Sequence, residues 1–248
     1  MIILITNDDG IFAPALSALR TELASLGRVI TVAPDRDQSA TSHSLTLHRP
    51  FRIHRHDVDV YSVDGTPTDC VVCAWYGLLD APPDLVVSGI NHGPNMGEDV
   101  FYSGTVAAAI EGTLQGAPSI AASLVTRERT DFLEPAAFVA RLARTVVERG
   151  LPKRSLLNVN LPFRPWDAVE GVRITRLGSR VYQDTLVRKQ DPRGRDYYWI
   201  GGSEAVWDPE EGTDFRAVHD GYVSVTPLRL DLTDREGLER LAGWGLEK

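Results

Sequence analysis

The sequence predicts an α/β fold: a Rossmann-like three-layer α/β/α sandwich with a mostly parallel sheet, plus a C-terminal β-hairpin and a tail helix. Short apolar, β-branched runs recur along the first two thirds of the chain, and helical patterns separate them. This repeated order requires crossover connections, so the strands run parallel and helices cover both faces of the sheet. Hydrophobic residues make up 43% and charged residues 24% of the 248 residues, as in ordinary folded globular proteins.

The first strand–helix–strand unit is expected over residues 2–33. Residues 2–6 form an apolar run that ends in a polar turn, and Pro14 then opens a helical pattern. The apolar face of that pattern consists of Leu16, Leu19, Leu23 and Leu26. Residues 28–33 predict the second strand, which Pro34 ends.

The rest of the sheet is predicted from the same kind of pattern. Strands are expected at 58–63, 84–88, 119–125 and 155–160, and helices at 68–79, 104–115 and 134–149. Ser103 is a suitable N-cap for the second of these helices, and Gly116 stops it. Residues 34–50 are expected to form a loop that leads into a short extended piece.

The character of the chain changes after Pro162, so we expect a catalytic core at 1–162 and an extension at 163–248. The expected elements of the extension are a strand at 172–177, a hairpin at about 180–201, an acidic loop at 208–214, a strand at 222–228 and a tail helix at about 234–246. Thr233 and Glu236 are spaced as a capping box at the start of the tail helix.

The extension carries apolar side chains that need a partner. The hairpin contains Tyr182, Tyr197, Tyr198 and Trp199, and the tail helix contains Leu238, Leu241 and Trp244. An isolated hairpin is marginally stable in water, and exposed aromatic residues usually mark contact surfaces. We therefore expect the extension to complete the core and to hold a homo-oligomer together; the alternative is that both elements fold back on their own sheet.

Charge and composition limit the possible partners. The chain has 26 Lys and Arg against 34 Asp and Glu, a formal charge of −8 that argues against capture of nucleic acid polymers or anionic membranes. Cys70 and Cys73 are too few for a disulfide framework and lie inside an apolar helical run, where core packing is expected. No membrane span or signal peptide is recognisable, so a cytoplasmic location is expected.

The strongest local signal is Asn7-Asp8-Asp9-Gly10, directly after the first strand. Doubly wound sheets bind ligands at the carboxyl ends of their strands, where Asp8 and Asp9 are expected to lie. Two adjacent carboxylates repel, so one is protonated or a cation lies between them, and a divalent ion with oxygen ligands fits best. The alternative is a solvated turn, because Asn, Asp and Gly all form turns.

Two further loops follow strands at the same sheet edge. Ser39, in the loop after the second strand, offers a neutral oxygen ligand, although a loop serine is more often only a turn or cap. Residues 88–97 combine three glycines with Asn91 and Asn95, whose amides suit a metal or an anion. A flexible loop is the alternative for that segment. His92 is a candidate general acid or base, and His43 and His48, which follow the Ser39 loop, are candidates to line the cleft.

The segment Ser103-Gly104-Thr105 begins a helix and is a candidate phosphate cradle. Unpaired backbone N–H groups, two hydroxyls and the positive end of the helix all favour a phosphate there. Ordinary N-capping by Ser103 is the alternative, and both functions are compatible. The chain lacks the P-loop, dinucleotide-binding, zincin and α/β-hydrolase motifs.

Taken together, these residues resemble the SurE family of stationary-phase survival proteins. The matching stretches are TNDDG at 6–10, APDRDQSATSHSLTL at 33–47, DGTPTDC at 64–70, SGINHGPNMGEDVFYSGTVAAAIEG at 88–112 and YVSVTPL at 222–228. They occur in the same order as in the family and span nearly the whole chain.

The resemblance implies a metal-dependent 5'-nucleotidase that also acts on 3'-monophosphates and, in some members, on short polyphosphate. It implies one divalent cation, Mg²⁺ or Mn²⁺, held by Asp8, Asp9, Ser39 and Asn91. It also implies phosphate contacts from Asn95, Ser103, Gly104 and Thr105, and a homodimer or homotetramer. Our preferred catalytic roles are those of Asp8, which orients the attacking water, and Asn95, which stabilises charge on the phosphoryl oxygens.

Two other function classes are compatible with an acidic pair after the first strand. A receiver-like signalling module binds Mg²⁺ in this way, but it needs a phosphoacceptor Asp after its third parallel strand, where this chain has Ser-Gly-Ile-Asn. A metal-dependent esterase of non-phosphate substrates is the second alternative, and the candidate cradle at Ser103 argues against it. Base preference, the choice between Mg²⁺ and Mn²⁺, and the choice between dimer and tetramer remain open at this point.

Overall fold

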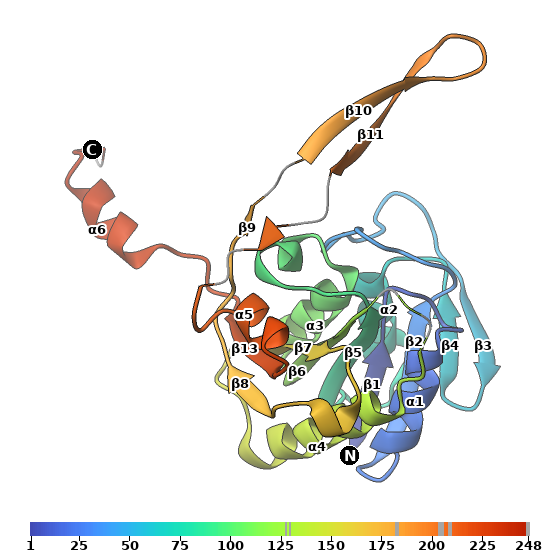
Figure 1. Cartoon of the computed structure of the whole chain (residues 1–248). Coiled ribbons are helices and arrows are strands. Elements are labelled where there is room, and N and C mark those ends of the chain that lie inside the picture. The colour runs from blue at the N-terminus through green and yellow to red at the C-terminus, as the bar shows by residue number, and fades with distance from the viewer. Residues whose placement is uncertain (127, 129, 182–183, 203–205, 208–209, 247–248) are drawn as a thin grey trace.

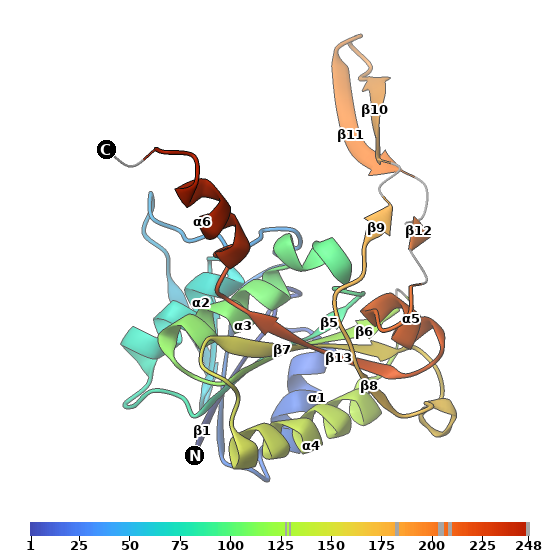
Figure 2. The same cartoon turned by 90° about the vertical axis from the view of Figure 1, so that its left-hand side faces the viewer.

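The computed structural model describes residues 1–126, 128, 130–181, 184–202, 206–207 and 210–246. Its centre is a nine-stranded sheet with strand order β3-β4-β2-β1-β5-β6-β7-β13-β8. Helices cover both faces of this sheet, and a hairpin and a terminal helix stand away from it (Figures 1 and 2). The predicted α/β/α sandwich with a hairpin and a tail helix is therefore confirmed. No helix in the described ranges is long and apolar enough to span a bilayer.

Six parallel strands form the middle of the sheet. They are β1 (Ile2–Thr6), β2 (Arg28–Pro34), β4 (Val60–Val63), β5 (Leu85–His92), β6 (Ser119–Val125) and β7 (Ser155–Pro162). The chain moves outward from β1 through β2 to β4, then returns to place β5 on the other side of β1. This reversal makes the gap between β1 and β5 the topological switch point, where open α/β sheets bind ligands.

The outer strands mix parallel and antiparallel pairing. β3 (Ile53–Asp57) pairs antiparallel with β4 at one edge. At the other side β13 (Val223–Arg229) pairs antiparallel with β7, and β8 (Val172–Ile174) closes the sheet parallel to β13. The last strand of the chain thus lies between two earlier ones.

The helices form two layers with separate apolar cores. On one face lie α1 (Pro14–Leu23) and α4 (Leu133–Arg149), whose buried side chains join those of the sheet in the largest cluster (Figure 2). On the other face lie α2 (Pro67–Cys73) and α3 (Gly104–Gln115). Cys70 and Cys73 are buried free thiols in this second layer, as expected from their apolar surroundings.

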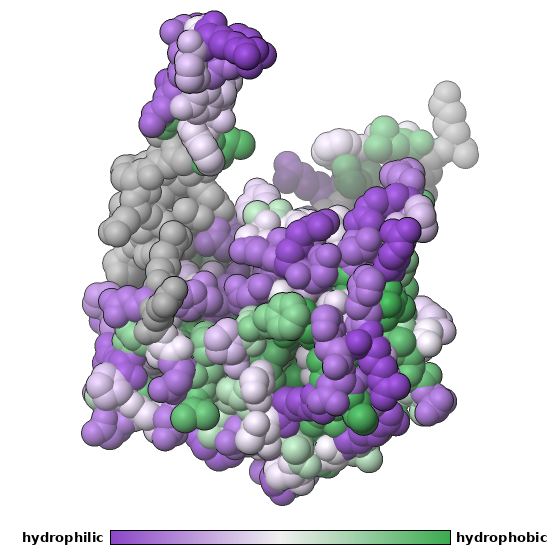
Figure 3. Space-filling view, turned by 90° about the vertical axis from the view of Figure 1, so that its right-hand side faces the viewer, coloured by the Kyte–Doolittle hydropathy of each residue, from purple (hydrophilic) through white to green (hydrophobic). Residues whose placement is uncertain are grey.

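The hairpin consists of β10 (Asp184–Gln190) and β11 (Asp196–Gly202), which pair antiparallel and rise well clear of the body (Figures 1 and 3). Short strands β9 (Arg180–Val181) and β12 (Val206–Trp207) pair below it. The tail helix α6 (Arg235–Ala242) projects separately (Figure 2). Tyr182, which we placed in the hairpin, lies outside the described residues.

Several expected boundaries are wrong for identifiable reasons. The helix expected at 68–79 begins at Pro67, which is favourable at a first turn, and continues after Cys73 as a π-helical turn at Ala74–Leu78. The strand expected at 172–177 ends at Ile174. The tail helix is capped by Asp234, which accepts a hydrogen bond from the Gly237 amide, and not by Thr233.

Several elements of the structure were not predicted from the sequence. β3 completes a hairpin with β4 although its side chains are exposed and lack the apolar alternation of a half-buried strand. The acidic segment before residue 214 ends in helix α5 (Asp214–His219), capped by the Thr213 hydroxyl. A 3₁₀ helix, η3 (Trp166–Ala168), follows β7.

Asp214 ties the C-terminal extension to the loop that follows β5. Its buried carboxylate accepts hydrogen bonds from the amides of Gly97, Gly178 and Phe215 at 2.8–2.9 Å. Burial raises the pKa of this carboxyl, and the three amide donors lower it in part. Because three chain segments converge on one side chain, the position of the loop at 93–97 depends on the extension.

We expect Asp214→Ala to lower the free energy of unfolding by roughly 3 kcal/mol, because it leaves three backbone donors without their acceptor, two of them in segments far apart along the chain. Urea unfolding followed by circular dichroism measures this change. Glu239→Ala on the exposed tail helix is the control and should change stability by less than about 0.5 kcal/mol. A loss below about 1 kcal/mol in Asp214→Ala would contradict the anchoring role.

Candidate active site

The predicted acidic pair lies at the switch point, at the end of β1. The turn that carries it is clamped by Asn7, a fully buried residue whose side-chain amide donates to the Gly10 carbonyl at 3.1 Å and accepts from the Gly10 amide at 3.2 Å. Gly10 takes φ +99°, a conformation that side chains disfavour. Local sequence therefore fixes the direction in which the chain leaves the strand, and with it the positions of Asp8 and Asp9.

Asp8 is joined directly to the first turn of α3. Its carboxylate accepts a hydrogen bond from the Thr105 amide at 3.1 Å and another from the Thr105 hydroxyl. The approach requires glycine at 104, because a Cβ there would lie 2.9 Å from the Cβ of Asp8. Asp8 is only 5% exposed, so little water reaches its carboxylate. The two hydrogen bonds from Thr105 take the place of that water. The acidic pair and the predicted cradle are thus parts of one site.

The electrostatics of the pair match the repulsion expected from the sequence. Burial raises the pKa of Asp8, with the hydrogen bonds from Thr105 acting in the opposite direction. Burial and the neighbouring Asp8 charge raise the pKa of Asp9 to about 6. Asp37, in the loop after β2, adds to the upward shift at both residues. The His92 amide and the charge of the His92 ring act in the opposite direction at Asp9, but the net shift at both carboxyls is upward.

Ser39 reaches the same area through its loop. The amide of the preceding residue, Gln38, donates to the backbone carbonyl of Asp8 at 2.8 Å. Ser39 is exposed, and both its amide and its hydroxyl donate to the Asp37 carboxylate, at 2.7 and 2.6 Å. The lone pairs of the Ser39 oxygen remain available for a cation, because the hydroxyl acts as donor. Asp37 lay within the quoted motif, but its part in the site was not predicted.

Asn91 and His92 form the β5 side of the site. The Asn91 amide nitrogen donates to the Gly93 carbonyl at 2.9 Å, which leaves its side-chain oxygen as an acceptor. The His92 amide approaches the Asp9 carboxylate at 3.4 Å. The His92 ring contacts the Glu128 carbonyl at 2.7 Å and packs edge-on against Phe132. The ring of His92 is thus directed to the loop after β6.

Asn95 is buried within a network of polar side chains. Its side-chain amide donates to the Ser123 hydroxyl at 2.8 Å, and its backbone amide donates to the Asn160 side chain at 2.9 Å. The side chains of Asn158 and Asn160 both donate to its carbonyl, at 2.8 and 2.9 Å. These supporting residues were missed, although two asparagines at alternate positions of an apolar strand were a usable signal.

The start of α3 has the cap that the sequence predicted and lies next to the acidic pair. The Ser103 hydroxyl accepts from the Val106 amide at 3.1 Å, as expected for an N-cap. The Thr105 amide donates to Asp8, so it is already committed and supports the acidic pair. Ser103, Gly104 and Thr105 are all buried next to Asp8. Together they place the positive end of a twelve-residue helix beside two carboxylates.

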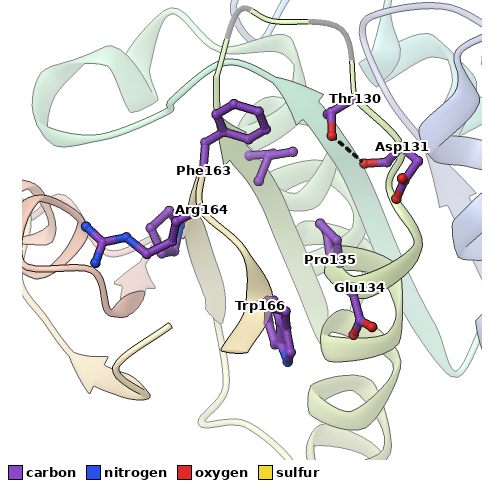
Figure 4. A pocket seen from close by; sticks show the side chains of 9 residues that line it. Thr130, Asp131, Glu134, Pro135, Phe163, Arg164 and Trp166 are labelled. Carbon is purple, nitrogen blue, oxygen red and sulfur yellow. Dashed lines mark hydrogen bonds between the residues drawn. The ribbon is translucent and has the colours of Figure 1, made fainter. Parts of the chain in front are cut away.

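A separate cavity of about 140 Å³ opens at the ends of β6 and β7, on the α4 side of the sheet (Figure 4). Its lining consists of Leu124, Thr130, Asp131, Glu134, Pro135, Pro162, Phe163, Arg164 and Trp166. None of the predicted site residues belongs to this lining. The pairing of Leu124 with His92 in the sheet places the cavity on the far side of His92 from the acidic pair.

The donor set suits a hard divalent cation. In the described part of the chain, no three Cys, His, Asp or Glu side chains gather as a metal site. A cation bound by Asp8 and Asp9 would therefore complete its shell with neutral oxygens, and Ser39 and Asn91 have oxygens available nearby. Burial is the main cause of the raised pKa of both carboxyls, and a bound cation would favour their charged forms.

The residues of this site lie within a region that is similar to a known protein family. A family model described as "Survival protein SurE" matches residues 3–184. The chain belongs to the SurE family. The resemblance drawn from the sequence motifs is thereby confirmed over residues 3–184.

Individual members of the SurE family are similar over their whole length. The 5'-nucleotidase SurE of Geobacter sulfurreducens is 52% identical over 247 residues, covering 99% of this chain and 94% of that protein. The 5'-nucleotidase SurE of Gemmatimonas aurantiaca is 53% identical over 251 residues, covering both completely. The crystal structure of the SurE protein from Aquifex aeolicus matches with a TM-score of 0.89 at 46% identity, covering 98% of this chain and 99% of that one.

We expect Asp9→Asn to stabilise the metal-free protein at pH 7.5 by roughly 1–3 kcal/mol. A carboxyl whose pKa rises from 3.8 to about 6 on folding opposes folding above pH 6 and has no such effect below pH 4. The gain should therefore shrink as the pH falls from 7.5 to 4. Urea unfolding in EDTA at both pH values measures it.

Asp167→Asn is the matched control, because Asp167 is exposed on η3. It should leave the free energy of unfolding unchanged at both pH values. An Asp9→Asn gain that is equal at pH 4 and pH 7.5 would show that ionisation of Asp9 is not its cause.

Proposed function

We propose that the chain is a metal-dependent phosphomonoesterase that hydrolyses nucleoside 5'-monophosphates to nucleoside and phosphate. The observation that carries this proposal is the direct bonding of Asp8 to Thr105, which joins an acidic pair to the start of α3. The proposed cation site and the proposed anion site are adjacent. A phosphate group could therefore contact the cation and the start of α3 at the same time. The names of the relatives, 5'-nucleotidase SurE, support the same substrate class.

The proposed roles follow from these contacts. Asp8, Asp9, Ser39 and Asn91 would hold Mg²⁺ or Mn²⁺, which when bound supplies Lewis-acid stabilisation and a more acidic water. Asp8, fixed by Thr105, would orient the attacking water, and Asn95, fixed by Asn158 and Asn160, would stabilise charge on the phosphoryl oxygens. Ser103 and Gly104 would contact the remaining oxygens at the helix start.

The finer substrate range belongs to the same proposal. Hydrolysis of 3'-monophosphates and of short polyphosphate requires only the phosphate contacts, since the cation and the helix start bind oxygens common to all these substrates. A location in the cytoplasm and a lack of binding to nucleic acid polymers or membranes remain predictions from composition.

The two alternative functions, a receiver-like module and a non-phosphate esterase, can be distinguished by the products that each would form. A receiver-like module would accumulate an aspartyl phosphate from a small phosphodonor. A non-phosphate esterase would hydrolyse p-nitrophenyl acetate, whereas a phosphomonoesterase would hydrolyse p-nitrophenyl phosphate. The bonding of the acidic pair to a helix N-terminus favours the phosphate substrate, because that helix end stabilises anions.

We expect chelation with EDTA to abolish phosphate release from AMP, and Mn²⁺ or Mg²⁺ to restore it better than Zn²⁺, because every proposed ligand atom is oxygen. Asp8→Asn should lower turnover at least a hundredfold while leaving the circular dichroism spectrum unchanged. Full activity in metal-free protein, verified by elemental analysis, would overturn the metal requirement. Wild-type turnover in Asp8→Asn at saturating metal would overturn the role of Asp8.

The extension at 163–248 is proposed to serve a homodimer or homotetramer as well as to complete the 1–162 core. The hairpin has Leu186, Tyr198, Trp199 and Ile200 exposed, and the tail helix region has Leu238, Trp244 and Leu246 exposed. Figure 3 shows the hairpin projecting from the body, and these apolar side chains are exposed in the described part of the chain. A second copy is the proposed partner.

We expect that replacing residues 187–199 with Asn-Gly lowers the oligomeric state in light scattering. The replacement joins Leu186 to Ile200, which pair in the hairpin, by a two-residue turn of the favoured type. Metal affinity measured by calorimetry should be retained, because the proposed ligands lie in the core. A wild-type chain that is monomeric at micromolar concentration, or a shortened chain that keeps the wild-type mass, would contradict this proposal.

A further inference from the structure

Two aromatic side chains stand exposed beside the start of α3. Phe101 ends the 3₁₀ helix η2 (Gly97–Phe101), and Tyr102 directly precedes Ser103. Each is 60% exposed, whereas Ser103, Gly104 and Thr105 are buried. Consecutive Cα atoms are about 3.8 Å apart, and Tyr102 directly precedes Ser103. The two aromatic residues are therefore immediate neighbours of the proposed phosphate site. Exposed neighbouring aromatics of this kind mark a contact surface.

The backbone that carries these rings is fixed by Ser42. The Ser42 hydroxyl donates to the Phe101 carbonyl at 2.6 Å, and the Ser42 amide donates to the Tyr102 carbonyl at 3.1 Å. From the other side, the Tyr102 amide donates to the Asp99 carbonyl at 3.0 Å. Val100, between them, is buried in the core. Hydrogen bonds to the backbone of Phe101 and Tyr102 therefore fix the positions from which the two rings project.

Ser42 belongs to a strap, residues 38–46, that crosses from the acidic pair to the α2–α3 layer. Its first residue, Gln38, is bonded to the Asp8 carbonyl. Farther along, His43 pairs with the buried carboxylate of Glu111 at 2.9 Å. Thr46 donates from its amide at 2.9 Å and from its hydroxyl to the buried carboxylate of Asp69. The strap thus connects the metal-binding and aromatic parts of the site in one rigid arrangement.

We propose that Phe101 and Tyr102 form a platform on which the base of the nucleoside monophosphate stacks. The proposal rests on the proposed function, since it places the phosphate at Ser103–Thr105. In a nucleoside monophosphate a single ribose separates the base from the phosphate. With the phosphate at the start of α3, the base would therefore contact residues close to Ser103. Base–aromatic stacking needs no particular hydrogen-bonding edge, so the platform accepts purines and pyrimidines, with purines favoured by their larger rings.

The cavity of Figure 4 is a less suitable place for the base. None of the residues proposed to bind the phosphate lines this cavity, and the pairing of Leu124 with His92 places it on the far side of His92 from the acidic pair. Its rim also carries Asp131 and Glu134, whereas Phe101 and Tyr102 are continuous with the cradle along the chain. The aromatic residue at this cavity, Phe163, therefore provides a matched control.

The test compares AMP with ribose 5-phosphate, which lacks only the base, on the Mn²⁺-loaded enzyme. We expect the ratio of the two kcat/KM values to fall roughly tenfold in Tyr102→Ala or Phe101→Ala, the size ordinarily lost with one base–aromatic stack. Tyr102→Phe should keep the wild-type ratio, because the ring remains. Phe163→Ala should also keep it. Light scattering on each variant reports whether the assembly is preserved.

Other results would reject stacking of the base on Phe101 and Tyr102, and each would indicate a different explanation. A lowered ratio in Phe163→Ala alone would place the base in the cavity of Figure 4. An unchanged ratio with an altered oligomeric state in Tyr102→Ala would make the aromatic pair a subunit contact. If the wild type hydrolyses neither compound, the proposed function fails, and calorimetry still decides the platform: AMP should bind at least fivefold more tightly than ribose 5-phosphate, and equal affinities would reject it.

Discussion

The hydrogen bonds from Thr105 to Asp8 are the constraint on which the site depends. They bring the end of β1 and the first turn of α3, which are 97 residues apart, into direct contact. A Cβ at position 104 would crowd this approach, and the two bonds from Thr105 go to different oxygens of the Asp8 carboxylate. A buried carboxylate next to a second one is unfavourable by itself. The helix end stabilises it, and the proposed cation would stabilise it further.

Support for this centre comes from strands on either side of the switch point. Gln38 attaches the β2 loop to the Asp8 backbone, and Asn160 in β7 holds the loop after β5 through Asn95. Asp214 fixes the same loop from the extension. The proposed chemistry therefore relies on polar side chains that touch no substrate, an arrangement that keeps reacting groups in place when the ligand is absent.

Local features of the site were predictable, whereas its supports were not. Asp8, Asp9 and the Ser103 cap could be placed because each depends on residues a few positions away and on where a strand or helix ends. Asn160 and Asp214 act on partners 65 and 117 residues distant, and one sequence contains no measure of such proximity. The helix at 214–219 was missed for the same reason: its first residues, Thr213 and Asp214, are typical of a polar loop until the buried partners of Asp214 are known.

The position of β13 has a consequence for synthesis of the chain. Ser224 and Thr226 of β13 pair with Asn160 and Asn158 of β7, so the strand that supports Asn95 has an unpaired edge until residue 229 has left the ribosome. Unpaired edges of nascent chains are prone to wrong pairing. Because sixty residues separate β7 from β13, the central sheet is completed only after β13 has been synthesised, and the strand that supports Asn95 lacks this neighbour before then.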